Sequence, residues 1–126
     1  MNVENMQRLI AFLKELPDER FTMRVFSEEA ECGTVACIAG WAAILAAEER
    51  GELPKEGEEK RDAREFLGLS AVEADFFFFG DFSLEVSLGA IKREDAIEAL
   101  EKALEFGVCE EGRREIGDHF IRKVSR

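Results

Sequence analysis

An uncharged stretch at residues 32–47 constrains the fold of this chain more than any other feature. It ends at two glutamates and is shorter than the roughly 18 to 20 apolar residues that a membrane-spanning helix needs. Residues 35–50 are rich in alanine and free of proline, so they favour a helix, with the Thr34 hydroxyl as its N-terminal cap. Apolar residues lie on nearly every side of this helix, and Gly40 permits close approach of a neighbour beside the bulky Trp41. We therefore expect a buried helix at the centre of the fold.

Helical spacing of apolar residues recurs on both sides of this stretch. We expect further helices where that spacing is clear, at residues 3–16, 91–106 and 111–124. Residues 21–26 alternate apolar and polar only briefly, so we expect a loop that two side chains anchor. Residues 51–59 contain proline, glycine and mixed charge and should form a surface loop.

Two shorter helices are marked by the residues at their ends. Residues 60–67 have a helical pattern that Gly68 ends, and Ser70 begins the next helix, with Glu73 at the third position of a capping box. These two helices should form a hairpin. No convincing pair of strands is visible. The sequence therefore predicts one all-α domain over residues 1–126, with about six helices packed as antiparallel hairpins around the central apolar helix.

Charge and cysteine content narrow the partners and the compartment. The 28 acidic and 17 basic residues give a net charge of −11, which repels nucleic-acid phosphates and anionic membrane surfaces. We therefore expect neither direct nucleic-acid binding nor membrane binding. Residues 1–16 carry charges on a helical pattern and lack the apolar segment of a signal peptide, and the cysteines are odd in number. These features predict a cytoplasmic protein with free thiols.

Three short motifs resemble a known pattern. They are Phe21-x-Met23, Cys32-Gly-Thr-Val-Ala-Cys37-Ile-Ala-Gly40-Trp41-Ala, and Phe66-Leu-Gly-Leu-Ser70 with Glu73-Ala74. Together, over residues 5–107, they resemble a family of small uncharacterised proteins of bacteria and their phages. The resemblance implies an all-helical domain, with stacked helices in an armadillo-like arrangement, and a structural role for Gly33, Thr34, Gly40 and Trp41. It implies no known activity, so no catalytic residue is transferred.

A thiol site is the first chemical candidate. Cys37 falls near the third position of the expected central helix, where unpaired backbone N–H groups lower a thiol pKa, and Cys32 could be its resolving partner. Three glutamates just upstream, Glu28, Glu29 and Glu31, would raise that pKa if they fold nearby. The spacing also differs from the two-residue gap of thioredoxin-like motifs. We favour buried thiols that close a tight turn over a redox or nucleophilic pair.

A zinc site and a cysteine–histidine pair are weaker candidates. Cys32, Cys37, Cys109 and His119 are of the types that zinc prefers, but neither cysteine pair has the close spacing of a zinc ribbon. A lone histidine near the end of a terminal helix is more often a packing residue than a base, even with Asp118 beside it. We therefore predict no metal, no cofactor and no catalytic residue.

Four consecutive phenylalanines, Phe76, Phe77, Phe78 and Phe79, form the candidate interface. Four neighbours on a helix point in all directions and cannot all face one core, so at least one should lie at an interface. Either the neighbouring helix and the irregular residues 83–90 cover the far side, or an exposed apolar patch marks a partner or dimer surface. In the second case, Phe77→Ser or Phe78→Ser should leave the fold intact and abolish association.

The sequence identifies no activity, and it favours a binding role by default. The leading hypothesis is a non-enzymatic interaction module of bacterial or phage origin, which binds a protein partner or a second copy of itself. An acidic decoy that occupies a DNA-binding protein is one form of it. The alternative is a thiol-dependent redox protein or enzyme that uses Cys37 with Cys32.

Overall fold

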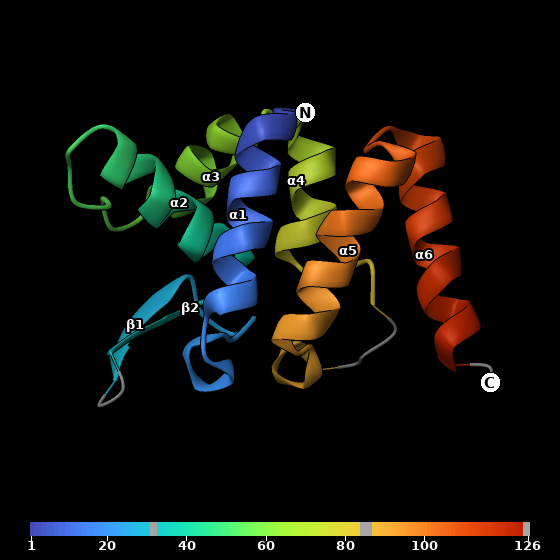
Figure 1. The fold of residues 1–126 in the computed structure, drawn as a ribbon, viewed down its shortest axis with the longest axis horizontal. Coiled ribbons are helices and arrows are strands. Elements are labelled where there is room, and N and C mark those ends of the chain that lie inside the picture. Colours follow the sequence, from blue (N-terminus) through green and yellow to red (C-terminus); the bar gives the residue numbers. More distant parts are fainter. Residues whose placement is uncertain (31–32, 84–86, 125–126) are drawn as a thin grey trace.

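A computed structural model describes residues 1–30, 33–83 and 87–124 of the chain, and these contain six α-helices (Figure 1). The helices are α1 (Val3–Glu15), α2 (Ile38–Glu49), α3 (Glu59–Leu67), α4 (Ala71–Phe78), α5 (Arg93–Phe106) and α6 (Glu110–Val124). Two short 3-10 turns, η1 (Asp18–Arg20) and η2 (Leu88–Ala90), and two strands, β1 (Ser27–Ala30) and β2 (Gly33–Ala36), complete the described elements.

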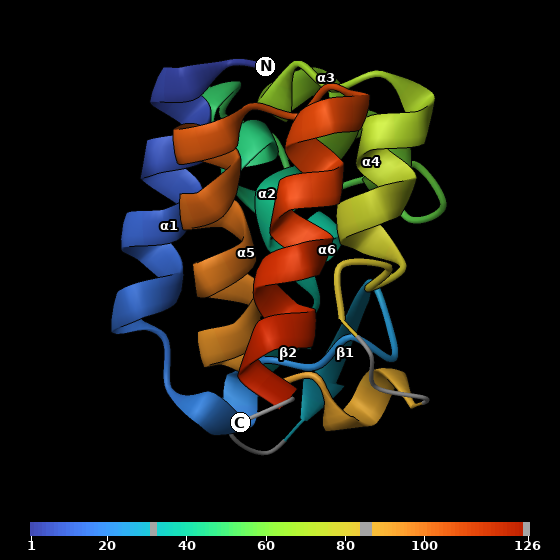
Figure 2. The same ribbon diagram turned by 90° about the vertical axis from the view of Figure 1, so that its right-hand side faces the viewer.

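Helix α2 is buried, as the sequence predicts, and packs against α1, α3 and α4. Helix α5 packs between α1 and α6, and α3 packs against α2 (Figures 1 and 2). Trp41 of α2 is 3% exposed and packs on Phe12 of α1, with ring centroids 5.0 Å apart. The all-α class is therefore confirmed, whereas the armadillo-like stacking stays a prediction. Within the described residues, no helix combines the length and the apolar character that crossing a bilayer requires.

Several helix ends also follow the sequence signals. Gly68 ends α3 in the left-handed conformation, with φ of 65°. Ser70 and Glu73 form the expected capping box of α4, each side chain accepting a hydrogen bond from the other residue's backbone N–H. Both patterns are short and local, so the α3–α4 connection depends little on the rest of the fold.

The expected absence of strand pairs is wrong. Strands β1 and β2 form an antiparallel hairpin with Ser27 opposite Ala36 and Glu29 opposite Thr34. All residues of β1 are exposed, so this strand has no alternation of apolar and polar residues that could reveal it. The hairpin is stabilised instead by contacts of its second strand, β2, with the residues before the hairpin. Arg20 Nε donates to the Thr34 carbonyl oxygen at 2.9 Å, and the Thr22 N–H donates to the Ala36 carbonyl oxygen at 3.0 Å.

The hairpin also shifts the start of the central helix. Thr34 lies in β2 and its hydroxyl donates to Glu29 Oε1 at 2.7 Å, so it does not cap a helix. Helix α2 begins at Ile38, and Cys37 is its N-cap, with its sulfur accepting from the Gly40 N–H at 3.4 Å. The predicted helix over residues 35–50 therefore begins three residues too early. The alanine-rich sequence has a high helix propensity from residue 35 onward, but Val35 and Ala36 pair with β1 as part of β2 instead.

The C-terminal helices match their predicted ranges closely. Helix α5 begins at Arg93 and ends at Phe106, with Gly107 as its C-cap, and α6 buries Ile116 and Phe120 as expected. Ile121, which we expected to be buried, is 45% exposed. The side chain of Val124 lies outside the described residues.

Candidate functional site

The motif residues Gly40 and Trp41 join the hairpin to the central helix. A Cβ atom at Gly40 would overlap the Phe26 carbonyl oxygen, so only glycine lets α2 approach the segment before β1 this closely. Trp41 Nε1 donates to the Arg20 carbonyl oxygen at 3.1 Å, and the Arg20 guanidinium lies over the Trp41 ring at 5.4 Å. Because Arg20 also binds the Thr34 carbonyl oxygen, these residues fix the hairpin on α2.

The four phenylalanines divide between core and surface. Phe77 and Phe78 are 0% and 3% exposed, so they belong to the core, and serine at either position would destabilise the fold. These two residues therefore follow the alternative in which the run is covered, and the exposed-patch alternative, in which their replacement leaves the fold intact, is wrong for them. Phe76 is partly buried against Phe77 and Phe82. Phe79, just past the end of α4, is 47% exposed and is the member of the run that reaches the surface.

Phe79 borders a hollow that we term the apolar groove. It has a volume of about 140 Å³ and lies between the segment before β1, the end of α4 and η2. Its apolar lining consists of Met23, Val25, Phe26, Phe78, Phe79 and Leu88. Phe26 and Leu88 are each 37% exposed, so the groove is open to solvent on apolar side chains from three separate segments.

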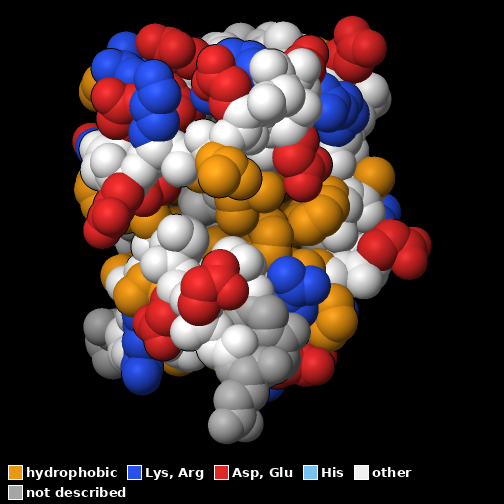
Figure 3. Space-filling view, turned by 90° about the vertical axis from the view of Figure 1, so that its left-hand side faces the viewer, with side chains coloured by type: hydrophobic (Ala, Val, Ile, Leu, Met, Phe, Trp, Pro, Cys, Tyr) orange, Lys and Arg blue, Asp and Glu red, His pale blue; other side chains and the backbone are white. Residues whose placement is uncertain are grey.

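A second hollow, which we term the acidic cleft, adjoins the apolar groove at Phe26. It has a volume of about 520 Å³ and separates β1 from the loop between α2 and α3. Its charged lining consists of Glu28, Glu29, Glu56 and Glu59, and none of the described basic residues lines it. Figure 3 looks onto this end of the molecule, where hydrophobic side chains gather in the middle of the face and acidic side chains lie on both sides of them.

The Cys37 thiol lies in the wall of the apolar groove but is only 3% exposed. Burial raises the pKa of this thiol, and the Glu59 carboxylate adds to the effect, whereas hydrogen bonds from backbone N–H groups oppose it. The helix position that we expected to lower the pKa is not the one that Cys37 occupies, since it is the N-cap. The thiol is therefore poorly suited to act as a nucleophile. Cys32, its proposed resolving partner, lies outside the described residues.

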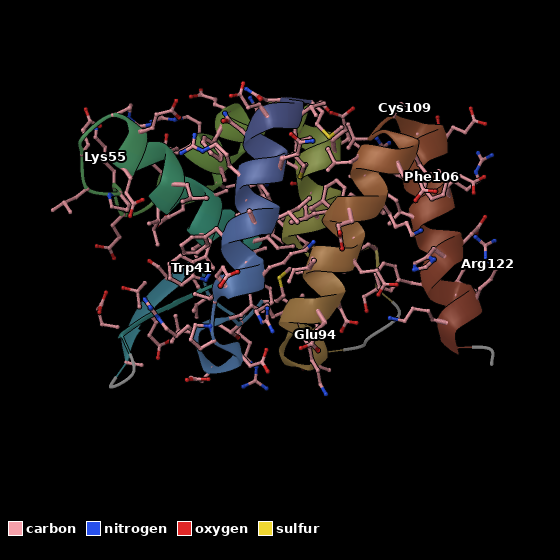
Figure 4. All side chains as sticks on the ribbon, in the orientation of Figure 1. Trp41, Lys55, Glu94, Phe106, Cys109 and Arg122 are labelled. Carbon is pink, nitrogen blue, oxygen red and sulfur yellow. The ribbon has the colours of Figure 1, made fainter. Side chains whose placement is uncertain are left out.

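The remaining candidate ligands lie at the other end of the molecule. Cys109 is exposed just before α6, far from Trp41 and the hairpin (Figure 4). His119 Nε2 is 2.5 Å from Glu98 Oε1, and Lys123 Nζ is 2.7 Å from Glu98 Oε2, so these groups join α5 to α6. Within the described residues, no three histidine, cysteine or acidic side chains are placed to hold a metal ion.

Sequence reasoning found only part of this surface. The phenylalanine run includes Phe79 but does not distinguish it from the other three, and Glu28 and Glu29 were considered only as neighbours of the thiols. Phe26, Leu88 and Glu56 were missed, because they meet through the hairpin and the loops and no local pattern connects them.

Comparisons with models of protein families, with curated proteins and with solved structures give no match to this chain. The resemblance of the Cys32–Trp41 motif to small bacterial and phage proteins therefore stays a prediction. The surface consists of an apolar groove beside an acidic cleft, and this geometry is the basis for its proposed role.

Proposed function

We propose that this protein is a non-enzymatic interaction module, and that it binds a partner protein through the apolar groove. The observation that carries the proposal is the convergence of Phe26, Phe79 and Leu88, all 37% to 47% exposed, on one hollow. Exposed apolar side chains that cluster around a concavity mark binding surfaces far more often than scattered ones do.

The state of Cys37 favours this role over a thiol-dependent enzyme. Its sulfur caps α2 and accepts a hydrogen bond from Gly40, and burial raises its pKa, so the reactive thiolate is scarce at neutral pH. In the groove the thiol acts as a small apolar wall. The alternative redox function would need a thiolate that this environment disfavours.

The origin and the compartment of the module remain part of the proposal. The cysteine motif supports a bacterial or phage protein, and the odd cysteine count supports a reducing cytoplasm. The net charge of −11 disfavours nucleic acid and anionic membranes as direct partners. It is compatible with a decoy that occupies a DNA-binding protein.

The test compares Phe79→Ser with Val72→Ser in affinity capture from a bacterial lysate. Both side chains lie on or beside α4 and are exposed, by 47% and 62%, but only Phe79 lines the groove. Wild type and Val72→Ser should retain the same captured protein, and Phe79→Ser should lose it while keeping its circular dichroism spectrum. Equal capture by both folded variants would contradict a role for the groove.

A further inference from the structure

We infer that the segment recognised by this surface combines a basic with an apolar side chain, a lysine or arginine in the acidic cleft and a neighbouring aromatic or aliphatic residue in the apolar groove. The inference rests on the proposed function and names the chemistry of its partner. It follows from the two hollows sharing Phe26 as a common wall.

The charges of the acidic cleft are available to a ligand. Among the described residues, none of the ion pairs uses Glu28, Glu29, Glu56 or Glu59. Glu29 accepts a hydrogen bond from Thr34, which orients it without neutralising it. A partner cation would therefore meet four carboxylates that form no ion pair with the described basic residues, in a chain of net charge −11 that also speeds its approach.

The two basic residues at the apolar groove give the ligand a direction. Lys60 lies over the Phe79 ring at 4.7 Å, but its charge is paired with Asp75 at 2.7 Å. Arg24 lines the groove itself, and its guanidinium lies beside Gly89 of η2. A ligand cation is therefore favoured on the Phe26 side only, where the cleft begins, and disfavoured near η2.

The volumes set what each hollow can hold. An apolar cavity of about 150 Å³ accommodates one benzene molecule, so the apolar groove, at about 140 Å³, matches a single ring or branched side chain. The acidic cleft, at about 520 Å³, has room for a long basic side chain with its hydration water. Because Gly40 holds the Phe26 backbone against α2, the wall between the two hollows is fixed. The basic and apolar side chains must therefore be near neighbours in the ligand.

The experiment selects a display library of short random peptides on the wild-type protein and measures the affinities of the winners. The selected peptides should carry lysine or arginine next to an aromatic or aliphatic residue. The double variant Glu28→Gln and Glu56→Gln should lower the affinity of these peptides by up to about fivefold for each carboxylate removed, which is the upper range for an exposed ion pair. Glu110→Gln with Glu111→Gln, the same change of net charge at the far end of the molecule, should leave them unchanged. Added salt should weaken binding to wild type more than to the cleft variant.

Each other outcome overturns a defined part of the argument. If the selected peptides lack lysine and arginine but their binding still requires Phe79, the inference is wrong, whereas the proposed interaction module is not contradicted. Peptides that bind Phe79→Ser as well as wild type would overturn the groove, and so would a library without any binder. Self-association of the wild type in sedimentation velocity, lost in Phe79→Ser, would replace the basic segment by a second copy of the chain.

Discussion

Gly40 sets the distance between α2 and the segment before β1, because a side chain there would overlap the Phe26 carbonyl oxygen. Gly40→Ala should therefore lower the free energy of unfolding by about 1 to 3 kcal/mol, as overpacked sites do. Urea denaturation measures the change. Gly117→Ala is the matched control: its Cβ would meet nothing within 4 Å in α6, so it should stabilise by about 0.5 to 1 kcal/mol. Equal effects of the two substitutions would refute the close approach.

Cys37 and Cys109 provide a second prediction at single residues. Burial raises the pKa of Cys37, and its sulfur is shielded, whereas Cys109 is exposed. Alkylation of the native protein between about pH 7 and pH 9, the range in which an ordinary thiol ionises, should therefore label Cys109 first. Cys37 should react only on unfolding. Peptide mass spectrometry separates the two sites, and fast native labelling of Cys37 would reopen the thiol-enzyme alternative.

Among the elements, α6 is fixed to α5 by the contacts of Glu98 with Lys123 and His119. Partial burial alone would raise the pKa of Glu98, but hydrogen bonds from Lys123 and His119 hold it below its ordinary value. A lowered carboxyl pKa stabilises the fold above the unfolded-chain value of about 4.3, and this stability is lost as the pH falls through the folded pKa.

Replacement of Glu98 by glutamine should therefore destabilise the protein near neutral pH, and the difference from wild type should shrink below about pH 4. Urea unfolding across that range measures both effects. Glu115→Gln on α6 is the control, since Glu115 has no ion pair among the described residues. A difference that stays constant with pH would mean that the Glu98 carboxylate contributes by packing alone.

The elements also show what a sequence can and cannot predict. Gly68 and the Ser70–Glu73 capping box determine the α3–α4 connection within a few residues, so their pattern was sufficient. The hairpin has no such pattern, because β1 is exposed and the hairpin is held by Arg20 and Thr22, which lie outside both strands. The candidate site follows the same rule. The phenylalanine run could be found from the sequence, but which of its members is exposed could not, and the groove exists only because η2 and the segment before β1 bring distant residues beside Phe79.

At the scale of the whole molecule, the net charge of −11 works against compactness. Raising the ionic strength from about 0.01 M to about 0.1 M shortens the Debye length from about 30 Å to about 10 Å. The free energy of unfolding at neutral pH should therefore rise over that range in sodium chloride. The double variant Glu110→Gln and Glu111→Gln should respond less. A fall in stability with salt would show that the ion pairs outweigh the repulsion.

Hydrogen exchange in the exposed hairpin should report whether a ligand is bound. Two short strands with one fully exposed member contribute little burial, so their hydrogen bonds should open by local unfolding well before the helices do. Because Phe26 lines both hollows and Ser27, Glu28 and Glu29 line the acidic cleft, a bound segment would hold that hairpin closed. Amide hydrogen exchange in β1 and β2 should then slow while exchange in α6, at the far end, stays the same.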